Sequence, residues 1–297
     1  MDVTPQNLRL IYTGLSTAFN QRLAATTTMY RQIAMEVTST TSQNEYPRLD
    51  EIPGLREWVG DRVIHDLSAG TYAIKNREFE GTIGVDRDKI EDDQVGLYTP
   101  IAQQLGQNTA EFPDLLTFPL LKKGHQTLCS DGQNFFDTDH PGYNETGAEI
   151  SVSNYQDGTG PAWFLIDTSQ VLKPLVFQNR RAFRLTAKDK LDDDNVFHKK
   201  KFIWGVDGRC NVGFGMWQLA FMSKAALTPE NYAAARAAMG TLRRRDGAPL
   251  NIAPRILLHP PSLEADALKV LKATLINGGD TNVWAGTAEP VKCPWLA

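Results

Sequence analysis

The sequence predicts an α+β fold, because helical and strand patterns occupy different parts of the chain. Apolar residues recur at helical spacing near the N-terminus and again between residues 88 and 124. After residue 160, strand-type runs dominate: AWFLID, KPLVFQ, KKFIWGVD and GMWQLAFMS. With 297 residues, of which 41% are hydrophobic, the chain can form one large domain or two to three small ones around a packed core.

Charge and cysteine usage exclude several classes of protein. The net charge of −4 gives no global basic field for nucleic acid and no polybasic membrane signal. The start, MDVTPQNLRL, does not have the pattern of a secretory signal, and no apolar run approaches the ~20 residues of a membrane span. Cys129, Cys210 and Cys293 are too widely spaced for a disulfide framework or a CxxC zinc pair, which indicates a reducing cytoplasm and buried thiols.

The first element is an amphipathic helix that Thr4 caps and Pro5 begins. Its apolar stripe consists of Leu8, Ile11, Tyr12, Leu15, Phe19 and Leu23. The polar, turn-rich stretch TSTTSQNEYPRLDE follows and reads as a linker. We therefore expect the helix to leave the body as a separate arm.

The next element is an antiparallel hairpin with its turn at Ser68, Ala69 and Gly70. Val63, His65 and Leu67 alternate on one arm, and Phe79, Gly81, Ile83 and Val85 alternate on the other. One face of the hairpin is polar and has few large apolar residues to pack against the body. We therefore expect the hairpin to project from the body. Because a projecting two-stranded hairpin is marginally stable, another subunit is expected to cover it.

Helical patterns return in residues 88–124, where Pro100, Pro113 and Pro119 predict a kinked or broken helix. Nearer the C-terminus, Thr228 caps a helix that is expected to run to about Arg245, with three arginines in a last turn that favours cations. APLNIAPRILLHP reads as a buried strand. A further helix is expected from Ser262 to the glycines at 278 and 279.

The stretch DGQNFFDTDHPG, residues 131–142, is the strongest candidate for a catalytic or metal site. A calcium loop that starts at Asp137 would place Pro141 and Ala148 where oxygen ligands are needed, and Pro141 also breaks an aspartyl phosphotransfer motif. The favoured interpretation is a turn. Asp131 and Gly132 form a hairpin turn, Asp137 and Asp139 accept bonds from backbone N–H groups, and His140 ends the segment. The alternative is a metal-assisted hydrolase that uses Asp131, Asp137, Asp139 and His140.

Other motifs are weaker. The pair Gly213 and Gly215 lacks the third glycine of a dinucleotide fingerprint, so it indicates a bulge or close packing. GxSxG, P-loop and HExxH motifs are absent and the five histidines are scattered, which disfavours an enzyme without excluding one, because triads assemble from distant residues. We expect no enzyme and no cofactor. The block LDDDNVFHKKK fits either a solvated loop or an electrostatic contact between subunits.

The order of segments resembles the Mu-like phage major head subunit family, gpT, whose members have the Hong Kong 97-like major capsid fold. The most specific stretches are FFDTDHP and GVDGRCNVGFGMWQLA. Others are YPRLDEIPGLREWVGDRVI, YAIKNREFEGTIGVDRDKIEDDQVGLY, KPLVFQNRRAF and GAPLNIAPRILLHPPSLEADALKVL. Together the matching stretches cover most of the chain in the family's order.

The resemblance implies a division of the chain into five segments. They are an N-terminal arm (1–45), an E-loop hairpin region (46–87), a P-domain with its spine helix (88–158), an A-domain (159–282), and a C-terminal segment (283–297) that returns to the P-domain as an edge strand. The resemblance also implies that each subunit's hairpin lies over a neighbour's P-domain while its arm reaches under another. The implied intersubunit contacts are Ser68, Ala69, Gly70, Lys75, Leu8, Tyr12 and Phe19.

The implied function is that of a major capsid protein. It self-assembles into hexamers and pentamers of an icosahedral shell in the bacterial host cytoplasm and ends in the virion. The implied partners are further copies of the chain, a portal, a scaffold, a decoration protein, and double-stranded DNA through weak non-specific contact, with no membrane. The side chains of 131–142 are then expected to bond to backbone and to hold no metal.

Overall fold

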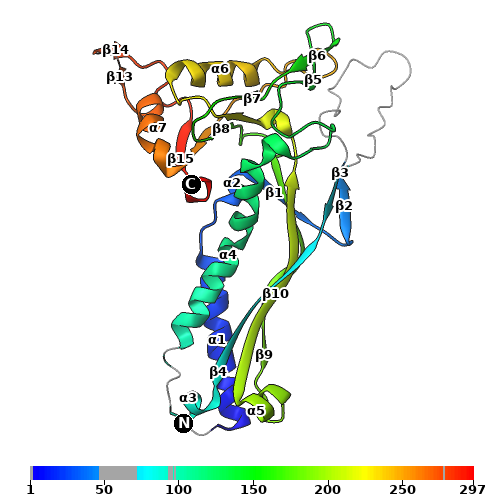
Figure 1. The fold of residues 1–297 in the computed structure, drawn as a ribbon, viewed down its shortest axis with the longest axis vertical. Helices are drawn as coiled ribbons and strands as arrows, with labels where there is room; N and C mark the ends of the chain where they lie inside the picture. The colour runs from blue at the N-terminus through cyan, green and yellow to red at the C-terminus, as the bar shows by residue number, and fades with distance from the viewer. Residues whose placement is uncertain (1–2, 47–71, 93–95, 97, 277) are drawn as a thin grey trace.

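Two long antiparallel strands and two long helices form an elongated limb, and a broader head sits at one end of it (Figure 1). The computed structural model describes residues 3–46, 72–92, 96, 98–276 and 278–297. The helices are α1 Pro5–Ala25, α2 Tyr30–Ile33, α3 Arg87–Glu91, α4 Tyr98–Lys122, α5 Asp194–Lys199, α6 Pro229–Gly240 and α7 Glu264–Leu271. Helices and sheets occupy separate layers, which confirms the α+β class.

The limb contains a four-stranded sheet in the order β1-β9-β10-β4. Its strands are β1 Ala34–Thr38, β9 Leu175–Lys188, β10 Lys201–Phe214 and β4 Arg77–Asp86. β9 and β10 each have 14 residues and pair antiparallel, β4 pairs antiparallel with β10, and β1 runs parallel to β9. Alternate residues of β10, among them Phe202, Trp204 and Val206, are buried, so one face of the sheet is covered by helices while the other is polar.

Helix α1 lies along the limb rather than leaving it as a separate arm. Thr4 caps the helix as predicted, by accepting a hydrogen bond from the N–H of Asn7. Leu8 and Phe19 are buried in a core that includes Val85, Leu185 and Trp204. The predicted separate arm is therefore wrong for this conformation, because the apolar stripe of the helix finds its partners on α4 and the limb sheet within the same chain.

Helix α4 is continuous over 25 residues, although Pro113 and Pro119 lie inside it. Of the predicted kink or break, the break is absent, since burial of the flanking turns against α1 and the head offsets the lost backbone hydrogen bonds, and the kink stays a prediction. Ala102 packs in the limb core, and Phe118 and Leu121 pack in the head core. The helix thus joins the two cores.

The predicted projecting hairpin is only partly described, because its turn at Ser68–Gly70 lies outside the described residues. The alternating stretch 77–86 does form a strand, but as β4 it is an edge of the limb sheet instead of a free arm, because β10 supplies its backbone partners. Before it, β3 Tyr72–Lys75 pairs antiparallel with β2 Gln43–Tyr46, which lies inside the predicted linker.

The head contains a five-stranded sheet in the order β15-β12-β8-β11-β7. Its strands are β15 Glu289–Lys292, β12 Ile256–His259, β8 Trp163–Ile166, β11 Ala220–Ser223 and β7 Tyr155–Gln156. The helices α6 and α7 pack on this sheet (Figure 1). Small hairpins complete the head: β5 His140–Tyr143 with β6 Glu149–Val152, and β13 Leu275–Ile276 with β14 Asp280–Thr281.

Both C-terminal helices are shorter than predicted. α6 begins after the Thr228 cap as expected but ends at Gly240, so Arg243 and the two arginines after it are not in a helical last turn. They belong to a hairpin in which the N–H of Leu250 donates to the oxygen of Leu242, because a glycine with φ 80° at position 247 reverses the chain. α7 ends at Leu271, before the predicted Gly278.

The predicted segment boundaries do not coincide with the division between limb and head. Residues 175–214, predicted within the A-domain, form most of the limb sheet beside α4, because the alternating apolar face of β10 packs under the helices. The C-terminal segment does supply an edge strand, but β15 joins the head sheet beside β12. None of the helices in the described residues combines the length and apolar character needed to cross a membrane.

The glycine pair at 213 and 215 marks close packing, as predicted. A Cβ on Gly213 would lie 2.2 Å from Cδ1 of Ile74, and one on Gly215 would lie 2.4 Å from the oxygen of Lys173. Both distances are shorter than any ordinary carbon contact. Glycine at these positions therefore lets β3 and the chain before β9 approach β10.

Candidate functional site

The segment 127–137 folds back on itself directly after α4. The N–H of Cys129 donates to the oxygen of Gln133 at 2.8 Å, and the N–H of Gly132 donates to the oxygen of Cys129 at 3.2 Å. Gly132 has φ 86°, a conformation that favours glycine. The Asp131–Gly132 turn is thus present, and the two buried phenylalanines that follow, 135 and 136, anchor it in the head core.

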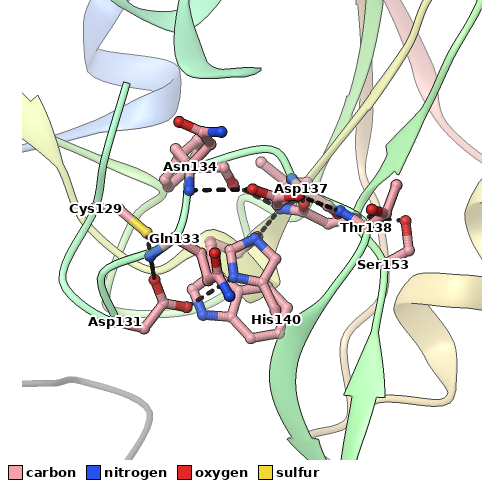
Figure 2. A network of polar contacts seen from close by, with 12 residues as sticks. Cys129, Asp131, Gln133, Asn134, Asp137, Thr138, His140 and Ser153 are labelled. Atoms are coloured by element: carbon pink, nitrogen blue, oxygen red, sulfur yellow. Dashed lines mark hydrogen bonds and ion pairs between the residues drawn. The ribbon is translucent and has the colours of Figure 1, made fainter. Parts of the chain in front are cut away.

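Asp131 is the centre of a buried polar network (Figure 2). Its carboxylate accepts hydrogen bonds from the N–H of Gln133 at 3.0 Å and from Sγ of Cys129 at 3.1 Å. It also lies 2.7 Å from Nδ1 of His140, and the side chains of Asp131 and His140 are 1% and 0% exposed. The expected bond to backbone is present between Asp131 and Gln133, but the expectation missed the side-chain partners, because the turn also brings His140 onto Asp131.

The network shifts the pKa values of Asp131 and Cys129. Burial opposes the charge of Asp131, but the hydrogen bonds from His140, Cys129 and Gln133 outweigh it and lower the carboxyl pKa. Burial, and then the charge of Asp131, raises the pKa of the Cys129 thiol far above its ordinary value. The thiol therefore stays protonated and acts as a donor.

The ring of His140 is held by stacking as well as by Asp131. The centroids of the His140 and Trp217 rings are 4.0 Å apart, and the angle between the ring planes is 6°. Nε2 of His140 is buried and has no hydrogen-bond partner among the residues that the structure describes. We assign the proton to Nδ1, which faces the carboxylate, because this leaves a lone pair rather than an N–H group unsatisfied at Nε2.

Asp137 does act as the predicted turn acceptor. Its carboxylate accepts from the N–H groups of Thr138 at 2.7 Å and Asn134 at 3.2 Å. Burial raises the pKa of Asp137, but these backbone donors prevail and the net pKa is lowered. Asp139 is exposed beside it.

The hydrolase alternative requires Asp131, Asp137, Asp139 and His140 to converge, and they do not. Among the described residues, the one group of metal-type ligands consists of Cys129, Asp131 and His140, whose ligand atoms lie within 4.8 Å of one another. Hydrogen bonds inside the network already engage the thiol, both carboxylate oxygens and Nδ1. These hydrogen bonds support a structural role for the network, in which the turn, β5 and the head core are held together.

Sequence reasoning missed Asn154, which ties this segment to the head sheet. Its Nδ2 donates to the oxygens of Phe135, Trp217 and Ala220 at 2.9, 3.3 and 3.3 Å. Its Oδ1 accepts from the N–H of Asp137 at 2.9 Å. Asn154 is 2% exposed, and no local motif signals it because its partners are distant in sequence or belong to the backbone.

A second buried amide network lies where the chain leaves for residues 47–71 and returns. Nε2 of Gln178 donates to Oδ1 of Asn76 at 2.8 Å and to the oxygen of Ile74 at 3.0 Å. Nδ2 of Asn76 donates to Oγ of Ser39 at 3.0 Å, and the hydroxyl of Tyr46 donates to Oε1 of Gln178 at 2.9 Å. This network, which sequence reasoning also missed, fastens β2 and β3 to β9.

The candidate intersubunit residues on α1 differ in how deeply they are buried within the chain. Leu8 and Phe19 are 3% and 0% exposed, so both side chains pack mainly within the chain; Leu8 keeps a small surface in a pocket beside α1. Tyr12 is half-buried and its hydroxyl donates to the oxygen of Leu185 at 3.0 Å. Lys75 is exposed, and positions 68–70 lie outside the described residues.

Relatives of the chain are structural proteins of phage heads. The model of the family described as Mu-like prophage major head subunit gpT matches residues 8–296. The major capsid protein of Escherichia phage Mu is 39% identical over 289 residues, which cover 95% of each chain. The Mu-like prophage FluMu major head subunit of Haemophilus influenzae is 41% identical over 281 residues, which cover 92% of this chain and 91% of that protein.

Solved structures agree. A chain of the procapsid of bacteriophage JBD30 superposes with a TM-score of 0.89 at 41% identity, covering 99% of this chain and 100% of that one. A chain of the bacteriophage JBD30 capsid superposes with a TM-score of 0.80 at 29% identity, covering 93% and 92%. With sequence and structure matched over nearly their whole length, the chain belongs to the Mu-like major head subunit family, gpT, and has the Hong Kong 97-like fold.

Proposed function

We propose that this chain is the major capsid subunit of a phage head and that many copies of it assemble into a closed shell. The observation that carries the proposal is the match, over 99% of the chain at a TM-score of 0.89, to a subunit of a procapsid. A subunit that keeps this fold over its whole length retains the surfaces with which such shells are built. Hexamers and pentamers around double-stranded DNA are the assembly that we propose.

The shape of the chain supports assembly. The limb is long and thin, with helices on one face of its sheet and a polar second face, so much of its surface is available to neighbours. The buried network around Gln178 and Asn76 holds the exit and return of residues 47–71 at a fixed place on the limb. The implied E-loop therefore starts from a rigid base, as a contact that reaches a neighbouring subunit requires.

We further propose a decoration protein as an external partner, since a related JBD30 capsid is described as decorated with minor capsid protein trimers, at a TM-score of 0.75 and 30% identity. A portal and a scaffold are proposed from the role alone, as is assembly in the cytoplasm of the bacterial host. No catalytic activity is proposed. The Asp131–His140 pair is buried and engaged in hydrogen bonds, which supports a structural role.

Electron microscopy and sedimentation of the purified protein, expressed alone and with the other head proteins of its phage, test the proposal. We expect closed shells, or hexamers and pentamers that convert into shells. A protein that stays monomeric in both preparations would overturn the proposal. Purified monomers that hydrolyse a substrate with divalent metal would instead favour the hydrolase.

A further inference from the structure

We propose that the outer end of the limb carries a contact between copies of this chain, in which Phe197 of one subunit enters a pocket beside α1 of another. Phe197 lies on α5, and the pocket is lined by α1 and by residues 189–192 between β9 and α5. This inference rests on the proposed function, because it names residues through which assembly occurs. It also chooses between the two interpretations of LDDDNVFHKKK.

The first observation is an aromatic side chain held out in solvent. Phe197 is 77% exposed, whereas its neighbour Val196 is 4% exposed and packs in the limb core. Nδ2 of Asn195 donates to the oxygens of Lys188 and Lys201 at 3.0 and 2.7 Å, which pins α5 between the two long strands. The ring therefore projects from a fixed helix rather than from a loop. Burying it in an interface then costs little conformational entropy.

The second observation is a pocket of about 580 Å³ at the same end of the molecule. Pro5, Leu8 and Tyr12 of α1 and Leu191 supply its apolar wall. Leu191 is 37% exposed, so part of this apolar wall is open to solvent. The pocket is large enough for an aromatic side chain, and the chain's own Phe197 does not fill it, since that ring remains exposed.

The pocket carries charges of both signs, and its two aspartates can pair with the two lysines that follow Phe197. In the described part of the chain, Lys199 and Lys200, which follow the ring, form no ion pair, and Asp192 at the pocket rim forms none either. Asp189 also lines the pocket, as do the cations Arg9 and Lys190. An entering Phe197 would bring its lysines toward the two aspartates, while the guanidinium of Arg9 can lie over the aromatic face.

The occupant is a second copy because the ring and the pocket occur together on every chain. When Phe197 of one copy enters the pocket of the next, the contact is head-to-tail. Such a contact closes into a ring when a whole number of equal rotations between copies makes one full turn. Burying a phenylalanine side chain removes apolar surface from water and so favours association. Repeated around a ring, that contribution favours closed assemblies over free subunits.

Cysteine pairing tests the contact directly. Phe197→Cys and Leu191→Cys are made in separate proteins, and the two are mixed under oxidising conditions during assembly. The native cysteines do not interfere, because all three are buried. We expect disulfide-linked dimers in the mixture that contain one subunit of each variant. Absence of such dimers from shells that contain both variants would overturn the inference.

Assembly yield is the second measurement. Phe197→Ser is expected to lower shell yield about tenfold, while its unfolding midpoint stays that of the unchanged protein because the ring is exposed. Val171→Ser is the matched control, since Val171 is also apolar and is 93% exposed. Asp192→Lys is expected to reduce assembly, and Lys199→Asp in the same chain to restore it. If the unchanged chain forms shells and Phe197→Ser forms them equally well, the contact is wrong while the proposed function stands.

Discussion

At the scale of single residues, Asp131 decides how the segment after α4 is organised. Its carboxylate accepts from three donors, and its partner His140 is stacked on Trp217, so one side chain links a turn, β5 and the head core. Truncating one partner of such a buried pair is costly, because the other polar group remains buried without a partner. The same buried carboxylate gives the stability of the protein a pH dependence.

Asp131→Asn is predicted to lower the free energy of unfolding at pH 7 by about 1–3 kcal/mol. Because the folded protein lowers the pKa of Asp131 below its ordinary 3.8, this stabilisation is present above about pH 4 and is lost as the pH falls through the folded pKa. The difference between the variant and the unchanged protein should therefore shrink below pH 4. Urea unfolding followed by tryptophan fluorescence at pH 7, 5 and 3 measures it.

The control for this experiment is Asp280→Asn, because Asp280 is exposed on β14. It should change the free energy of unfolding by less than about 0.5 kcal/mol. A difference between Asp131→Asn and the unchanged protein that stays constant from pH 7 to pH 3 would contradict the assignment of Asp131 as the titrating group.

The three cysteines are predicted to be unreactive in the folded protein. Burial raises the pKa of Cys210 to about 12 and that of Cys293 to about 11, and it raises the pKa of Cys129 further. Thiolate is the reactive form, so Ellman's reagent at pH 8 should modify none of them until urea is added, when three equivalents should react. Fast modification of one thiol in the native protein would show that its site opens.

At the scale of elements, the crossing of α1 and α4 depends on a glycine. A Cβ on Gly106 would lie 2.5 Å from the oxygen of Phe19 and 3.3 Å from both Cβ of Arg22 and the nitrogen of Leu23. Two of these atoms belong to backbone, which cannot move aside cheaply. The helices therefore pack at a distance that only glycine permits.

Gly106→Ala is predicted to destabilise the protein by about 1–3 kcal/mol, because the added methyl forces the two helices apart. Gly14→Ala is the matched control, since a Cβ there meets nothing within 4 Å and alanine favours the helix. It should stabilise the protein by about 0.5–1 kcal/mol. Urea midpoints of the two variants measure the pair, and equal shifts of the same sign would show that the crossing is not tight.

Helix starts and strand positions could be predicted from the sequence, while their partners could not. Thr4 and Thr228 mark helix starts through local hydrogen bonds that a few residues determine. The stretch 77–86 alternates as a strand, but its pairing with β10 depends on residues more than 100 positions away. For the same reason the Asp131–Gly132 turn was predictable, whereas the pairing of Asp131 with His140 and the role of Asn154 required the folded chain.

At the scale of the whole molecule, the described conformation is more similar to the JBD30 procapsid chain than to the JBD30 capsid chain, with TM-scores of 0.89 and 0.80. The limb and head each have a core, and Phe183 packs against both. Such a two-core subunit can keep each core intact while contacts at the limb and head surfaces change. The net charge of −4 is also a property of the whole molecule, and it weakens the electrostatic attraction to DNA.

The free subunit is predicted to bind double-stranded DNA very weakly. With a net charge of −4 it releases few counterions from the duplex, so at about 150 mM salt a subunit concentration of roughly 10 μM should not shift a short duplex in a gel. The same assay at lower salt tests for residual attraction. Tight binding that weakens steeply with salt would contradict the proposed weak and non-specific contact with packaged DNA.

Helix α4 makes the chain a lever. At 1.5 Å per residue, its 25 residues span about 37 Å. Its ends are embedded in different cores, Ala102 in one and Phe118 in the other. A tilt of about 5° imposed at the limb would therefore move the head end of the rod by about 3 Å. Small angular changes at the limb would then be amplified into displacements as large as a side chain at the head, while both cores stay intact.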